Sequence, residues 1–83
     1  MFLHITGVQY LSEYKLRVWF NNGKVREVDL RNELYGEIFE PLKDQLLFQK
    51  VQVNRDTQTI EWPNGADFAP EFLFEVSKEI QVA

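Results

Sequence analysis

The sequence contains no cysteine and only one histidine, His4. Without cysteine the chain cannot form a disulfide, a thiolate nucleophile or a cysteine-ligated zinc site. One histidine cannot supply a zinc ligand set, and the acidic residues lack the spacing of a calcium-binding loop. We therefore expect no metal, no cofactor and none of the disulfide frameworks that stabilise small secreted domains.

Long apolar runs are absent as well. Residues 1–5 carry neither the basic cluster of a signal peptide nor the start of an apolar stretch of the required length. No segment of the sequence has the uninterrupted apolar length of a membrane span. We expect a cytoplasmic protein that does not enter a membrane.

The sequence also lacks the common motifs of catalysis. The four glycines are isolated from one another, so they build no phosphate-cradling loop. Ser12 is expected in a turn and Ser77 on the polar side of the last helix, and neither has an activating base beside it in the sequence. Acidic pairs one helical turn apart do occur, but thirteen acids in so short a chain make them unavoidable. These features predict that the protein is not an enzyme.

Positive charge is sparse and scattered. The nine lysines and arginines give a net charge of −4 against the thirteen acids. Binding to nucleic acid requires several cations that converge on phosphates, so we expect no direct nucleic acid binding. Lys15, Arg17, Lys24 and Arg26 lie on one predicted hairpin, where they form either a local basic strip or an ordinary solvated face.

Aromatic residues, in contrast, are abundant. The 83 residues include seven Phe, three Tyr and two Trp, and each such side chain can bury about 150–250 Å². The chain is too short to divide into two cores, so we interpret residues 1–83 as a single domain. Because the core of so short a chain is thin, a homodimer would be an easy way to supplement it.

The first thirty residues show the alternation that is typical of strands, around positions 8–10, 16–20 and 26–30. This pattern predicts a three-stranded antiparallel meander. A two-residue turn at Asn22-Gly23 would place acids opposite the apolar face. A three-residue loop, with Gly23 in the left-handed conformation, instead pairs Leu16 with Val28 and keeps the apolar side chains together. The second register is the better one.

The rest of the chain shows the patterns of short helices, then of a second hairpin, and then of a last helix. Gly36 and Pro41 predict short, irregular helices from residue 31 to 49, with Asp44 capping one of them. Residues 50–54 and 59–62 form a second hairpin. A last helix extends from Pro70 to Ile80, for which Asp67 is the nearest cap.

This order of elements predicts an α+β fold. A small antiparallel sheet, made of the N-terminal meander plus the later β-hairpin, carries short irregular helices and a C-terminal helix packed on one face. Trp19 and Val25 are expected on the opposite face. The predicted core consists of Val8, Leu16, Val18, Val28, Leu30, Ile38, Phe39, Leu42, Phe48, Val51, Val53, Ile60, Phe72, Leu73 and Val76.

Residues 62–70 form the segment with the most distinctive sequence. One interpretation is a rigid recognition loop with Trp62 as its anchor and Asp67 ahead of a helix. The other interpretation is structural: Trp62 and Phe68 fix the loop to the core, Asn64 and Gly65 make a turn, and Asp67 caps the helix.

The same segment carries a resemblance to a known family. The similarity follows the order of the chain through residues 8–11, 16–20, 22–23, 28–30, 41–44 and 48, and ends in Trp62-Pro63-Asn64-Gly65-Ala66-Asp67 with Pro70-Glu71. In these residues the chain resembles a bacterial family known as domain of unknown function 2442. The resemblance implies a small α+β fold and no particular activity. Some relatives carry this domain ahead of a DNA-binding helix-turn-helix, which these 83 residues lack, and others resemble one half of a toxin–antitoxin pair.

The leading hypothesis is a non-enzymatic protein-interaction or regulatory module, such as the antitoxin-like half of a two-protein bacterial pair. Its partner would be a neighbour-encoded protein or a second copy of the chain. The alternative is a sensory domain that binds a small ligand between the sheet and the loop at residues 62–67. The candidate interaction residues are Arg17, Trp19, Arg26, Trp62, Asn64 and Asp67.

Overall fold

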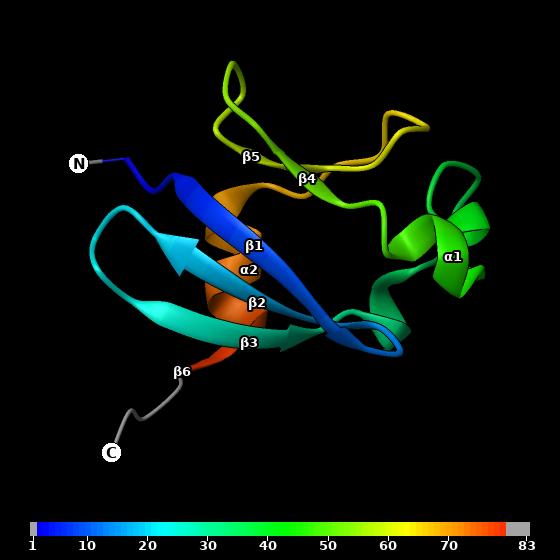
Figure 1. Ribbon diagram of the computed structural model, residues 1–83, viewed down its shortest axis with the longest axis horizontal. Coiled ribbons are helices and arrows are strands. Elements are labelled where there is room, and N and C mark those ends of the chain that lie inside the picture. Colours follow the sequence, from blue (N-terminus) through cyan, green and yellow to red (C-terminus); the bar gives the residue numbers. More distant parts are fainter. Residues whose placement is uncertain (1, 80–83) are drawn as a thin grey trace.

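The computed structural model describes residues 2–79 and has the predicted α+β architecture (Figure 1). Four strands form one antiparallel sheet in the order β1-β2-β3-β6, and β4 and β5 form a separate hairpin. The strands are β1 (Ile5–Ser12), β2 (Lys15–Phe20), β3 (Val25–Asp29), β4 (Gln52–Asn54), β5 (Thr59–Glu61) and β6 (Lys78–Glu79). The helices are the 3₁₀ turns η1 (Arg31–Glu33) and η2 (Glu40–Lys43), and the α-helices α1 (Gln45–Phe48) and α2 (Pro70–Val76).

The turn between β2 and β3 confirms the predicted three-residue loop. Gly23 has a φ of +86°, and the Phe20 amide donates a 2.9 Å hydrogen bond to the Lys24 carbonyl. Leu16 lies opposite Val28, as the longer loop requires. Because side chains alternate between the two faces of a strand, this register sets the apolar face of the whole meander.

The connector from β3 to β4 is irregular, as predicted, and its helices are one turn long. Asp44 caps α1, where its carboxylate accepts a 3.0 Å hydrogen bond from the Leu46 amide. Phe48, at the end of α1, is fully buried. The connector thus supplies a core aromatic residue without a long helix.

The end of the chain corrects the predicted helix. Helix α2 ends at Val76, and the chain then forms β6, which lies antiparallel to β3 with Lys78 opposite Glu27 and Glu79 opposite Arg26. The helix breaks at Ser77, whose backbone is extended at φ −96° and ψ 168°. Ile80, the predicted last helical residue, lies outside the described residues.

The core lies between the sheet and two elements that pack on the same side of it. Helix α2 lies behind the sheet in Figure 1, and the β4–β5 hairpin contacts β1. Ile5, Phe20, Leu34, Trp62 and Ala66 are buried although the predicted core omits them. The buried apolar side chains are Ile5, Leu16, Val18, Phe20, Val28, Leu30, Leu34, Leu42, Phe48, Ile60, Trp62, Ala66 and Leu73.

For two residues of the predicted core, Ile38 and Val76, the predicted burial is wrong. Ile38 is 46% exposed because the connector does not follow the helical spacing from which its burial was predicted. Val76 is 38% exposed because it ends α2 beside the edge of β3. Five others, Val8, Phe39, Val51, Val53 and Phe72, are only partly buried.

Candidate functional site

The face of the β1–β2–β3 sheet that points away from α2 is the candidate site. We call this surface the open face, because no helix of residues 2–79 covers it in Figure 1. The register places on it every second residue of β2 and β3 and the residues of β1 that lie opposite them. Its members are Gly7, Gln9, Ser12, Lys15, Arg17, Trp19, Val25, Glu27 and Asp29.

Trp19 lies on the middle strand, β2, near one end of the open face. Its neighbours across the sheet are Gly7 of β1 and Val25 of β3. A methyl group at Gly7 would stand 3.3 Å from the indole Cε3 atom, so the ring rests directly against the Gly7 backbone. Both residues are partly buried. The indole is therefore held close to the sheet, and an isolated strand glycine was the sequence signal for this close approach.

The other end of the open face carries charges in opposed pairs. Lys15 lies opposite Asp29 and Arg17 opposite Glu27, with 3.3 Å between Arg17 Nη2 and Glu27 Oε2. The Arg17 Nε atom is buried and has no hydrogen-bond partner among residues 2–79. Because an acid faces each base, the suggested basic strip does not form.

Arg26 belongs to the other side of the sheet. It lies opposite Val18, and its guanidinium donates from Nε to Ser77 Oγ at 2.6 Å and from Nη2 to the Ser77 carbonyl at 2.7 Å. The guanidinium carbon also lies 4.3 Å from the centroid of the Phe74 ring. Ser77 is 7% exposed, so its predicted place on a polar helix surface is wrong. Arg26 therefore holds the end of α2 against β3.

The loop that begins at Trp62 is built into the fold. Trp62 is 2% exposed and donates a 2.9 Å hydrogen bond from Nε1 to the Phe48 carbonyl. Asn64 donates from Nδ2 to the Ile38 carbonyl at 2.9 Å and accepts from the Ala66 amide at 3.1 Å. These contacts correspond to the structural interpretation of the segment.

Asp67 does not cap α2, which corrects the predicted role. Asp67 forms a β-bridge with Glu61, and the helix begins after Ala69 without a side-chain cap. Asp67 is exposed. Pro70 occupies the first turn, as predicted, where its missing amide hydrogen costs no helical hydrogen bond. The candidate residues therefore divide into the open face (Arg17, Trp19), the core side of the sheet (Arg26) and the loop (Trp62, Asn64, Asp67).

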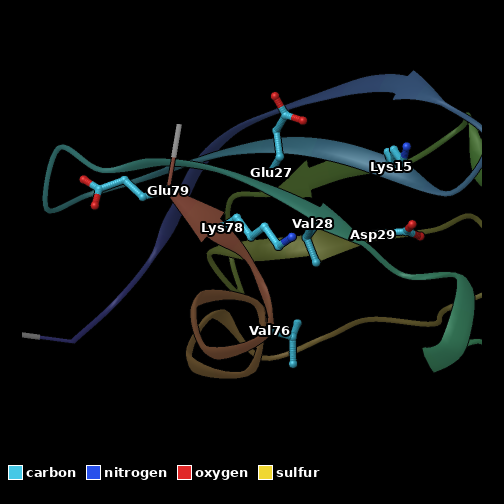
Figure 2. A pocket seen from close by; sticks show the side chains of 7 residues that line it. All are labelled: Lys15, Glu27, Val28, Asp29, Val76, Lys78 and Glu79. Atoms are coloured by element: carbon cyan, nitrogen blue, oxygen red, sulfur yellow. The ribbon is translucent and has the colours of Figure 1, made fainter. Parts of the chain in front are cut away.

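A hollow of about 520 Å³ adjoins the open face along the edge of β3 (Figure 2). Lys15, Glu27 and Asp29 line it from the sheet, and Lys78 reaches along β3 toward Val28 in the figure. β6 pairs only with the first part of β3, so the edge near Asp29 has no neighbouring strand within residues 2–79. The hollow thus extends the charged end of the open face around the sheet edge.

Residues 2–79 contain no group of three or more His, Asp or Glu side chains that could hold a metal ion. In the same part of the chain, every helix is too short or too polar to cross a membrane. His4, Ser12 and Ser77, the residues considered for a hydrolytic site, lie in three separate places: before β1, at the last position of β1 and just after α2. The predicted place of Ser12 in a turn is therefore wrong.

Comparison with known families identifies one match. The model of the family described as "Protein of unknown function (DUF2442)" matches residues 5–79, which is nearly the whole chain. The chain belongs to this family. The matched DUF2442 region begins with β1 and ends with β6, so it includes the open face, the loop at residues 62–67 and the Arg26–Ser77 contact. Searches of the curated proteins and of the solved structures find no match.

Proposed function

We propose that this DUF2442 protein is a non-enzymatic interaction module that binds a second small protein through its open face. In this proposal the chain is the antitoxin-like or regulatory half of a two-protein bacterial pair. The observation that carries the proposal is the position of Trp19: an aromatic ring held against Gly7 on a sheet face that no described helix covers.

Trp19 has the properties of an interface anchor. Tryptophan is enriched among the residues that dominate binding energy, because its large flat side chain loses little conformational freedom on binding. The contact with Gly7 already restricts the ring. Val25 beside it adds an apolar surface of the kind that a partner's side chain would bury.

The charges around Trp19 would set the partner and its orientation. Arg17 and Glu27 form a rim of opposite charges on one side of the ring. Such rim charges mainly affect the association rate and the choice of partner. The chain's net charge of −4 favours a partner of positive net charge.

The test is co-expression with the protein encoded by the neighbouring gene, followed by size-exclusion chromatography. We expect co-elution of the pair, and we expect Trp19→Ala to weaken the complex at least tenfold. Tyr35→Ala is the matched control, because Tyr35 is 69% exposed and lies in the connector, away from the open face. Equal effects of the two substitutions, or no complex at micromolar concentration, would overturn the proposal.

Self-association through the same face is the second outcome that the test distinguishes. Sedimentation equilibrium of the isolated chain would show a dimer whose dissociation constant rises in the Trp19→Ala variant. A monomer at all concentrations, together with a stable heterocomplex, assigns the open face to the neighbour-encoded partner.

The alternative of a small ligand beside the loop at residues 62–67 has little support. The Trp62 ring lies 5.5 Å from the Phe48 ring and 5.9 Å from the Phe68 ring, measured between centroids. The chain's own aromatic side chains thus occupy the space that the ligand would need.

A further inference from the structure

We propose that the pocket between the start of β1 and the β4–β5 turn binds a small oxyanion, the phosphate or carboxylate group of a small molecule. The pocket has a volume of about 290 Å³. It shares no residue with the open face, so this inference does not depend on the proposed protein partner. Its polar lining consists of His4, Thr6, Asn21, Arg55 and Gln58.

The charge of the lining selects an anion. None of the thirteen acidic side chains, all of which lie within the described residues, lines this pocket, whereas the hollow beside β3 contains three acids and two lysines. Arg55 is exposed and takes part in none of the ion pairs within residues 2–79, and the hydrogen bonds of His4 in this part of the chain use its backbone and not its imidazole. A guanidinium offers planar pairs of N–H donors that match the oxygens of phosphate and carboxylate groups.

Asn21 fixes the His4 side of the pocket. The Asn21 side-chain oxygen Oδ1 accepts a 3.0 Å hydrogen bond from the His4 backbone amide, and the Asn21 backbone amide donates to the His4 carbonyl at 3.0 Å. Its Nδ2 donates to the Phe2 carbonyl at 2.9 Å. The start of the chain is therefore tied to the β2–β3 turn, and the imidazole is presented from a fixed backbone.

Asn54 fixes the Arg55 side in a similar way. Its Oδ1 accepts hydrogen bonds from the Asp56 amide at 2.8 Å and the Thr57 amide at 3.2 Å. Gln58 closes the turn with a φ of +61°, a left-handed conformation that is uncommon for a residue other than glycine. Such conformations cost of order 1–3 kcal/mol and concentrate at functional sites.

A direct hydrogen bond joins the two walls. The Ile5 amide donates to the Gln58 carbonyl at 2.9 Å, so the segments that carry His4 and Arg55 hold one relative position. The Asn21 carboxamide uses its oxygen and one of its two N–H donors on the chain start, which leaves its second N–H without a partner among residues 2–79. We assign the contacts to the anion to the Arg55, His4 and Gln58 side chains, with this N–H as a further donor. The backbone that carries these side chains is held in place on both walls, which lowers the part of the entropic cost of binding that comes from ordering the main chain.

The size of the pocket limits the ligand. Pockets for drug-sized molecules begin at about 300 Å³, so this one suits an oxyanion with a short organic part. Phosphate and carboxylate groups share the required chemistry. Their different shapes allow titration with each to identify the preferred one.

The test is a titration of the ¹⁵N-labelled protein with inorganic phosphate and, separately, with acetate, followed by amide NMR spectra. Sodium chloride at matched ionic strength is the reference. We expect saturable shifts in residues 4–6 and 54–58 with at least one of the two anions, and the anion with the lower dissociation constant identifies the ligand class. Shifts that equal those of sodium chloride for both anions would overturn the proposal.

Substitution of the proposed ligands provides the second readout. We expect Arg55→Gln to raise the dissociation constant at least tenfold and His4→Gln to raise it severalfold. Lys50→Gln removes the same charge from an exposed residue outside the pocket and should leave binding unchanged. A well-dispersed amide spectrum of each variant would show that the variant is folded. Equal binding by the Arg55→Gln and Lys50→Gln variants would show only general charge attraction, which contradicts a built site.

Discussion

The Arg26 guanidinium donates two hydrogen bonds to Ser77, one to its hydroxyl and one to its carbonyl, and thereby ties the third strand to the residue that follows α2. Arg17, nine residues earlier on the neighbouring strand, points to the opposite face and pairs with Glu27, whose side chain is 43% exposed. The two arginines of one sheet therefore have different roles: Arg26 stabilises the fold and Arg17 lies on the open face. Replacing each of them by methionine distinguishes these roles through the loss of stability.

We expect Arg26→Met to lower the free energy of unfolding by about 2 kcal/mol, because the Ser77 carbonyl loses a charged donor and the buried Ser77 hydroxyl keeps only its bond to the Phe74 carbonyl. Arg17→Met should lower it by about 0.5 kcal/mol or less, since an exposed pair contributes little. Urea denaturation followed by circular dichroism measures both values. Equal losses would contradict the assignment of Arg26 to the structural side of the sheet.

The two tryptophans provide a second matched comparison. Trp62→Phe should cost about 2–3 kcal/mol, because the buried Phe48 carbonyl loses its hydrogen bond and part of a core ring is removed. Trp19→Phe should cost less than about 1 kcal/mol, since the ring is only partly buried on the open face. Thermal and chemical unfolding of the two variants would give the difference, and a larger loss at Trp19 would show that the open face is covered.

Substitutions at Gly65 test the backbone strain of the loop at residues 62–67 without changing side-chain packing. Its φ is +90°, and a methyl group there would meet no atom within 4 Å, so only backbone strain opposes a side chain. Gly65→Ala should therefore destabilise the protein by about 1 kcal/mol. Gly65→Asn should cost less, because asparagine tolerates the left-handed region. Identical stabilities of the two variants would show that strain does not govern this turn.

The meander could be predicted from the sequence because two local signals agree there. The alternation from Leu16 to Phe20 fixed the faces, and Gly23 fixed the loop length, so the partners of Leu16 and Trp19 followed. Local turn chemistry and the apolar pattern depend on residues close in sequence, and such signals are the ones that a single sequence carries.

The chain end could not be predicted in the same way. β6 contains two residues, too few to show alternation, and helical spacing through Val76 favoured a longer helix. Arg26, which binds Ser77 just after the helix, lies 51 residues away in the sequence. The alternation along residues 26–30 predicted that Arg26 and Val28 share a face, and the register confirms this.

The candidate site was only partly predictable for a related reason. Trp19 and Val25 were expected on the face opposite the helices, and the register places them there. The pocket residues His4 and Arg55 were missed because they come from the chain start and a distant turn. The hydrogen bond between Ile5 and Gln58 and the packing of β1 against β4 and β5 bring these segments together, and the periodicity of a single sequence does not indicate such long-range contacts.

Strand β6 also influences how the molecules behave toward one another in concentrated solution. An unpaired strand edge can act as a template for the backbone of another chain, which promotes aggregation. Lys78 and Glu79 occupy part of the β3 edge, and the Lys24–Glu79 ion pair holds them beside it. Lys15 and Asp29 place charges where this pairing stops. This short strand and its charged neighbours thereby discourage edge-to-edge stacking of sheets, while the open face stays free for contact.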